Sequence, residues 1–458
     1  MNRRARVPWR MLDGAAARQL FLLMTVLLAG CESVERVVDA RRDVTPHEAY
    51  ARSLQSAGLV GTALGRRWIE AARTAVATPV RVALPYREEG FLAADEPGAV
   101  GLLVDLRRGQ TLTVRTEFDA GDSARVFVDL FRLPSEPGEP VRPVVRADSL
   151  PDGLVYEPYR DGAYVLRLQP ELLRGGRYRV ELTIDPSLAF PVSGLDGSSI
   201  WSGFGAPRDG GARDHHGVDI FAERGTPALA AAPGEVTRVE ETNRGGLVVW
   251  IRDERRDQRM YYAHLSRQLV APGARVEIGD TVGLVGNTGN ARTTPPHLHF
   301  GVYARGPGMR GAQDPLPYLV RPRGRLPDLP DAPERLGGWA RVSAGGAELR
   351  AGPEREEQVA LLAPHTPVRL VAGHDGWWRV RLPDGRVGWL ARSSTELADA
   401  PLRETVLTGS STVQTAPRSE APVVQALEAG ASVRVLGEFS GYLWVEAEAG
   451  RGWVRVGA

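Results

Sequence analysis

Hydrophobic and polar positions change their spacing along the chain, and these changes divide it into segments. In residues 46–77 the apolar side chains, Trp68 among them, recur at helical spacing that Gly58 interrupts. Thr45 followed three residues later by Glu48 is a typical helix start. This stretch is predicted to form two short helices or one interrupted helix.

From about residue 80 to 186 the spacing changes to two. Val126–Leu130, Tyr164–Leu168 and Tyr178–Ile184 alternate between apolar and polar side chains, and Gly-rich or Pro-rich turns separate them. Such a series of short strands predicts a β-sandwich. No residue in it suggests chemistry, so a spacer or docking role is expected.

The C-terminal part is an internal repeat. The same interval separates Pro353 from Pro417 and Trp389 from Trp453, and similar short strands surround each pair. One small domain is therefore used twice, and its terminal Gly-Trp pair resembles bacterial SH3-like domains. That resemblance implies small barrels that hold cell-wall material. The alternative is a structural spacer with both tryptophans in the domain cores.

The expected fold class is mostly β and multidomain. The predicted segments are 1–30, a lipoprotein signal peptide; 31–79, an anchor and short helical stalk; 80–186, a β-sandwich accessory domain; 190–320, a β-rich domain carrying most of the histidines; 321–338, a Pro-rich linker; and 339–397 and 403–458, the two SH3-like domains.

The N-terminal segment is read as an export signal. Arginines precede an apolar run, Leu20–Gly30, that is well short of the roughly 20 residues a membrane-spanning helix needs. The run ends at Cys31, the only cysteine of the chain, which excludes an internal disulfide. Leu28 to Cys31 resembles a bacterial lipobox, which implies acylation of Cys31 and, with Glu32 after it, the periplasmic face of the outer membrane. A simple secretory signal is the alternative.

The charge balance narrows the range of partners. The chain has 57 basic and 56 acidic residues, for a net charge of +1. Such a balance gives no field strong enough to favour nucleic acid as a partner. The membrane, reached through the N-terminal anchor, is an expected partner.

Five of the eight histidines lie in the 190–320 segment. The β-branched and aromatic residues around His215 and Asp219 favour an extended chain, in which residues at even spacing share one face. His215 and Asp219 would then point the same way, with Gly217 leaving room for an ion. His216 would point to the other face and is not expected to be a ligand.

Two further sites complete the histidine set. His264 follows a tyrosine-rich stretch, and the His297-Leu298-His299 triplet is predicted to be a strand that places both histidines on one face. Zinc hydrolases need three protein ligands and an open position for water, with nearby neutral imidazoles for proton transfer. His215, Asp219, His264, His297 and His299 together meet this need.

These residues resemble a known family, the lysostaphin-type (LytM-like) zinc endopeptidases of peptidoglycan. The shared motifs are His215-x-Gly217-x-Asp219, Gly225-Thr226-Pro227, Tyr262-x-His264-Leu265, Gly286-x-x-Gly289 and His297-Leu298-His299-Phe300. The resemblance covers about residues 190–320. It implies that His215, Asp219 and His299 bind zinc and that His264 and His297 are catalytic.

The leading hypothesis for function is therefore a zinc-dependent endopeptidase that cuts peptidoglycan stem peptides or cross-links during wall remodelling. D-Ala–diaminopimelate cross-links are the expected target, and glycyl bridges are the alternative. The competing hypothesis is a non-enzymatic adaptor that activates another wall hydrolase, a role found where this domain has lost its ligands. All five positions are intact here. A pure wall-binding protein would leave the histidine set unexplained.

Overall fold

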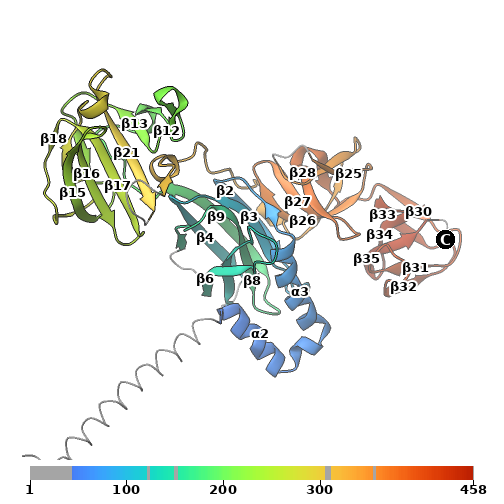
Figure 1. Cartoon of the computed structure of the whole chain (residues 1–458). Coiled ribbons are helices and arrows are strands. Elements are labelled where there is room, and N and C mark those ends of the chain that lie inside the picture. Colours follow the sequence, from blue (N-terminus) through green and yellow to red (C-terminus); the bar gives the residue numbers. More distant parts are fainter. Residues whose placement is uncertain (1–43, 121–123, 149–152, 305–310, 354–356, 457–458) are drawn as a thin grey trace, which may run out of the picture.

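The computed structural model describes residues 44–120, 124–148, 153–304, 311–353 and 357–456. Figure 1 shows the β-sandwich in the middle, the histidine-bearing domain on one side of it and the two C-terminal domains on the other. Within these residues, no helix is both long and apolar enough to cross a bilayer. The predicted signal segment and Cys31 lie outside the described residues.

Two helices precede the sandwich, as the sequence predicts. They are α2 (Pro46–Ser56) and α3 (Ala63–Ala77), joined through a short 3-10 turn, Leu59–Gly61. The predicted capping box is present, because the Thr45 hydroxyl accepts from the Glu48 amide and the Glu48 carboxylate accepts from the Thr45 amide. Gly58, with a φ of 72°, breaks the helical run.

The sandwich consists of two sheets that share one core. The first sheet has the order β1 (Val80–Arg81), β3 (Val100–Leu106), β8 (Gly162–Pro170), β5 (Val126–Arg132) and β6 (Arg142–Asp148), and the second contains β2 (Tyr86–Leu92), β9 (Gly176–Pro186), β4 (Gln110–Asp119) and β7 (Leu154–Tyr156). Leu102 and Val128 of the first sheet pack with Leu112 and Val180 of the second, all fully buried. The predicted β-sandwich is confirmed.

His47 of α2 makes the attachment of the helices to the sandwich sensitive to pH. Its Nε2 lies 2.6 Å from the Gln169 Oε1, and its ring stacks on Trp68. Burial, followed by the charge of Arg167, lowers the pKa of His47 to about 4. The folded state therefore binds fewer protons than the unfolded state, and stability falls as the pH drops from about 6.5 toward 4, by at most roughly 3 kcal/mol.

The variant His47→Gln has no imidazole at this position to titrate. We therefore expect the melting temperature of the full chain to depend less on pH in this variant than in the parent protein. The exposed His216 supplies the matched control, because His216→Gln removes an imidazole that is in water in both states. Equal slopes of melting temperature against pH in the two variants would contradict the assignment.

The histidine-bearing domain is built on one antiparallel sheet. Its order is β10 (Ile200–Ser202), β13 (Val218–Phe221), β21 (His297–Ala304), β17 (Gln258–Leu265), β16 (Gly246–Asp253), β15 (Gly234–Thr242) and β19 (Arg275–Val276), with β22 (Ala312–Gln313) beside β21. A smaller sheet, β14 (Pro227–Leu229), β20 (Thr281–Leu284) and β18 (Arg267–Gln268), a hairpin, β11 (Pro207–Arg208) and β12 (Arg213–Asp214), and the short helix α4 (Leu316–Leu319) accompany it.

The two C-terminal domains have the same strand order. The first contains β25 (Gln358–Leu362), β24 (Ala347–Arg350), β28 (Val387–Ala391), β27 (Trp377–Arg381), β26 (Pro367–His374), β23 (Trp339–Val342) and an additional β29 (Thr395–Leu397); the second contains β32 (Val423–Leu427), β31 (Ser411–Gln414), β35 (Gly450–Arg455), β34 (Tyr442–Ala447), β33 (Ser432–Phe439) and β30 (Arg403–Val406). The described strands form open sheets, so closed barrels are not observed. Trp389 and Trp453 are both buried.

The first C-terminal domain is joined to the sandwich rather than only tethered by the Pro-rich segment. Strands β2 and β26 pair antiparallel, Glu89 with Gly373 and Gly90 with Ala372. Next to this pairing, Arg379 donates to the Glu88 carboxylate at 2.9 Å, and both side chains are buried. The sequence did not predict this connection, because its two halves are 291 residues apart.

Candidate metal and catalytic site

Three neighbouring strands bring the predicted site residues together. In the register of the main sheet, Asp219 of β13 lies opposite His299 of β21, and His299 lies opposite Ala263 of β17. His264 is the next residue on β17, and His297 lies two residues before His299 on the same face of β21. Leu298 and Phe300 point into the hydrophobic core, as the alternation predicts.

His215 reaches the site in a different way from the predicted one. Strand β13 starts at Val218, so His215 lies in the loop after β12 and not on a continuous strand with Asp219. The strand argument for His215 is therefore wrong, although its side chain does meet that of Asp219. A loop hydrogen bond aims the ring, because the His215 Nδ1–H donates to the Gly203 carbonyl at 2.8 Å.

Three potential ligand atoms converge within this arrangement. The His215 Nε2 lies 3.0 Å from the Asp219 Oδ1 and 2.9 Å from the His299 Nδ1, and the His299 Nδ1 lies 3.0 Å from the Asp219 Oδ1. Ligand atoms bonded to one tetrahedral zinc at about 2.0–2.1 Å are roughly 3.3 Å apart. Two imidazole nitrogens and one carboxylate oxygen at this spacing fit a divalent cation such as zinc.

The same cluster favours an ionised carboxylate. Burial acts to raise the pKa of the Asp219 carboxyl, but the adjacent His215 and His299 imidazoles outweigh it and hold the pKa well below its usual range. Burial also lowers the pKa of His299. An anionic carboxylate beside neutral imidazoles is the protonation state that a metal requires of its ligands.

His264 and His297 flank these three residues. Their Nδ1–H groups donate to the carbonyls of Thr288 and Pro295, each at 2.9 Å, which leaves the Nε2 atoms free for other contacts. The His297 Nε2 lies 4.0 Å from the Asp219 Oδ1, and the centroids of the two flanking rings are 5.0 Å apart. Both histidines thus border the cluster without joining it.

Burial, followed by the charges of His299 and His297, lowers the pKa of His264 to about 4. His264 is therefore a neutral base at physiological pH. A neutral imidazole with a free Nε2 can accept a proton from water and return it to a leaving amine. All five residues line a cleft of about 860 Å³.

His216 lies outside the cluster. Its side chain is exposed, and its backbone carbonyl accepts from the Tyr303 hydroxyl at 3.1 Å. The cluster that could hold a metal within the described residues consists of His215, Asp219 and His299, without His216.

Arg208, at the end of β11, is a site residue that the sequence did not reveal. Its guanidinium donates to the Asp219 Oδ2 at 2.8 Å and to the Ser202 hydroxyl at 2.5 Å. This ion pair occupies one carboxylate oxygen and leaves Oδ1 directed at the two histidines. An isolated arginine in an arginine-rich chain gives no sequence signal, since only the hairpin places it there.

A stack of aromatic rings leads from the solvent into the cleft and was also not predicted. Trp201 is 73% exposed and stacks on Phe221 at 4.8 Å between centroids. Phe221 in turn stacks on His297 at 5.1 Å. The stack orients the His297 ring and offers a flat apolar surface at the rim.

Comparison with known families agrees with this geometry. Residues 213–311 match the family described as peptidase family M23. This segment is an M23 peptidase domain. Residues 343–396 match the bacterial SH3 domain family. The sequence-based prediction of a peptidase is thus confirmed at the level of the family, and one of the two predicted SH3-like domains is confirmed.

Curated relatives of the M23 domain differ in the bond that they cut. The glycyl-glycine endopeptidase ALE-1 of Staphylococcus capitis is 37% identical over 23% of this chain and 29% of its own length. The L-Ala–D-Glu endopeptidase of Bacillus subtilis is 35% identical over 29% and 42%. The peptidoglycan DD-endopeptidase ShyC of Vibrio cholerae is 39% identical over 24% and 26%. This chain therefore spans less than half the length of these relatives.

Gly217 is required by the site for a reason other than the predicted room for an ion. A Cβ at this position would lie 2.5 Å from the Phe300 carbonyl oxygen and 2.8 Å from the His299 ring. We expect Gly217→Ala to displace His299 and weaken metal binding by ~10–100-fold, the range seen when supports of ligands are removed. Metal titration of the purified protein measures the loss.

Gly345 provides the matched control, because a Cβ there would meet no atom within 4 Å and the residue lies outside the site. Gly345→Ala should bind metal as the parent protein does. If Gly217→Ala binds the metal as tightly as the parent protein, β21 can move without weakening the metal site.

Proposed function

We propose that this protein is a zinc-dependent endopeptidase of peptidoglycan. The observation that carries the proposal is the convergence of His215, Asp219 and His299 in an M23 domain, with His264 and His297 beside them. The three ligand atoms would hold the metal, and zinc bound there would supply a water whose pKa is lowered toward ~7.

The residues of the chain provide the other parts of the reaction. The free Nε2 atoms of His264 and His297 accept the proton of the attacking water, stabilise the developing oxyanion and donate a proton to the leaving amine. The carbonyls of Thr288 and Pro295 hold the two rings in the required tautomer. Arg208 holds the Asp219 carboxylate in place through their ion pair.

We propose the D-Ala–diaminopimelate cross-link as the bond, with glycyl bridges as the alternative. The similarity to a DD-endopeptidase supports the first and the similarity to a glycyl-glycine endopeptidase supports the second. Digestion of purified sacculi, with and without a chelator, followed by mass spectrometry of the products, tests both. We expect the protein to convert cross-linked dimers to monomers when no chelator is present, and not to do so when the chelator is added. No products under any condition would refute the enzyme.

We further propose that acylated Cys31 anchors the chain at the periplasmic face of the outer membrane. The apolar run that ends at Cys31 supports this location. Cys31→Ser offers no thiol to acylate, so it should remain an uncleaved precursor at the inner membrane or be released. Membrane fractionation measures the location of the variant. If Cys31→Ser fractionates with the outer membrane, as the parent protein is proposed to do, the lipid anchor is excluded.

The C-terminal repeats are proposed to hold the enzyme on the wall. The first matches the bacterial SH3 domain family, and the strand order shared by β23–β28 and β30–β35 supports the same assignment for the second. Trp389 and Trp453 are both buried, Trp453 in a cluster with Trp444 and Ala398, so other surfaces must make the contact.

A further inference from the structure

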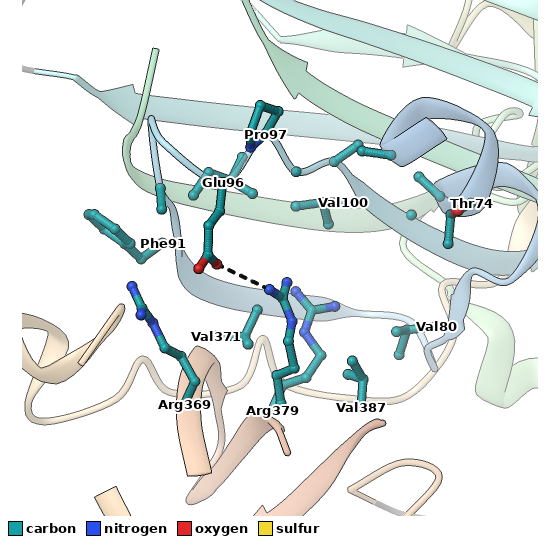
Figure 2. A pocket seen from close by; sticks show the side chains of 18 of the residues that line it. Thr74, Val80, Phe91, Glu96, Pro97, Val100, Arg369, Val371, Arg379 and Val387 are labelled. Atoms are coloured by element: carbon teal, nitrogen blue, oxygen red, sulfur yellow. Dashed lines mark hydrogen bonds and ion pairs between the residues drawn. The ribbon is translucent and has the colours of Figure 1, made fainter. Parts of the chain in front are cut away.

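A hollow of about 680 Å³ lies where the sandwich and the first C-terminal domain separate. Strands β2 and β26 pair only at Glu89–Gly373 and Gly90–Ala372. Beyond that point they diverge, and the hollow is lined by Phe91 and Leu92 of β2 and by Leu370 and Val371 of β26. Figure 2 shows this hollow from close by, with Phe91 on one side and Val371 on the other.

Basic side chains predominate in the lining. The charged residues are four arginines and two glutamates, namely Arg67, Arg369, Arg379, Arg381, Glu70 and Glu96. Figure 2 shows Arg369 and Arg379 entering the hollow from the strands of the C-terminal domain. An anion entering between these strands would therefore face several guanidinium groups.

The arginines differ in how their charge is used. Arg379 is 4% exposed and is held by the Glu88 carboxylate at 2.9 Å and by the Tyr178 hydroxyl at 2.7 Å. Its Nε is buried without a hydrogen-bond partner among the described residues. The Arg369 guanidinium lies over the Trp339 ring, 5.9 Å from its centroid, a contact that leaves the N–H groups available.

Glu96 is the acidic group that competes most directly for these donors. It pairs with Arg381 at 3.5 Å, and both side chains are about half exposed, at 51% and 46%. Such exposed pairs contribute little stability, so a carboxylate from outside can replace Glu96 at low cost. The dashed line in Figure 2 marks this ion pair.

We propose that this hollow binds a carboxylate-bearing stem peptide of peptidoglycan, at a site separate from the M23 cleft. Guanidinium groups pair with carboxylates through paired, charge-assisted hydrogen bonds. The apolar residues Val80, Phe91, Val100 and Val387 line the rest of the hollow and suit the aliphatic parts of such a peptide. An uncharged glycan would use neither feature.

The hollow is formed before any ligand binds. The β2–β26 pairing and the buried Glu88–Arg379 ion pair hold its two walls at a fixed spacing. A preformed site avoids the entropic cost of ordering its walls on binding. The identity of the ligand rests on the proposed function. The experiment that tests binding does not depend on hydrolysis.

The test measures binding of a soluble stem tetrapeptide to the full chain by calorimetry, with a chelator present to prevent cleavage. Replacing two arginines of the C-terminal domain, in Arg369→Ala/Arg381→Ala, should weaken binding by on the order of 10-fold or more, as expected for lost charge-assisted hydrogen bonds. Amidating the peptide's carboxyl groups should have a similar effect. Glu96→Gln should bind more tightly than the parent, because it removes the competing carboxylate.

Arg386→Ala is the matched control. Arg386 belongs to the same domain and pairs with Asp384 at 2.7 Å, but it does not line the hollow. If the double variant binds the tetrapeptide as tightly as Arg386→Ala does, the proposal is overturned. Equal affinity for the amidated peptide would also overturn it, as would displacement of the peptide by inorganic phosphate at similar concentration, which would indicate a phosphate site.

These outcomes are distinguishable from failure of the proposed enzyme. A parent protein that binds the tetrapeptide through these arginines but never cleaves sacculi would refute only the endopeptidase. A parent protein that cleaves sacculi, with tetrapeptide binding unchanged in the double variant, would refute only the hollow.

Discussion

Replacing His299 or His215 with alanine is expected to abolish stable zinc binding and, with it, all hydrolysis of sacculi. Each substitution removes one of three atoms that lie within 3.0 Å of one another, so two ligands remain. The loss of metal affinity should exceed the ~10–100-fold typical of removing a residue that only supports a ligand. Metal analysis of the purified variants measures it.

His216→Ala is the matched control for this experiment. It removes an exposed imidazole next to His215, outside the cluster. It should retain zinc and activity. Loss of zinc from His216→Ala, together with its retention in His215→Ala, would reverse the assignment of the two neighbouring histidines.

His264→Ala and His297→Ala are expected to lose hydrolysis while keeping the metal. Both side chains lie beside the three ligands, and their Nε2 atoms are the free proton acceptors of the cleft. A positioned acid–base group contributes typically ~10²–10⁴-fold to the rate. The rate on sacculi should fall by that factor at full zinc occupancy. Zinc lost in parallel with the rate would instead make these residues ligands.

The same variants separate the enzyme from the adaptor. His297→Ala changes little of the surface, since its ring is 5% exposed. A strain that carries it should behave as a deletion strain if hydrolysis is the function. Full complementation, together with no activity of the parent protein on sacculi, would favour an adaptor that activates another hydrolase.

Local sequence patterns were sufficient for much of the fold. The Thr45–Glu48 capping box and the strand alternation around Leu298 each depend on residues close in the chain. The repeat predicted the two buried tryptophans, Trp389 and Trp453. Their outcome follows from helix capping, from the two-residue period of strands and from burial of large apolar side chains. The histidine motifs likewise predicted a peptidase domain, and the match to peptidase family M23 agrees with that prediction.

The sequence also determined which residues could form the site, but not how each one reaches it. The register that sets Asp219 opposite His299 joins residues 80 positions apart in the chain. His215 is aimed by the Gly203 carbonyl rather than by a strand. The roles of Gly217 and Arg208 are consequences of the same contacts. No local pattern encodes a distance between two loops.

The tertiary structure alone decided how the domains are joined. Glu88 is uncharacteristic of a strand core. The hydroxyls of Tyr86 and Tyr178 donate to its carboxylate, and its charge is balanced by Arg379, 291 residues later in the chain. A buried charge is tolerated when an opposite charge and hydrogen bonds compensate for lost hydration. The sequence by itself specified the strands, the cores and the chemical groups. Pairing between distant segments determined which of these chemical groups meet. The reason is that the free energy of a buried ion pair or a shared sheet depends on contacts between segments that lie far apart in the chain.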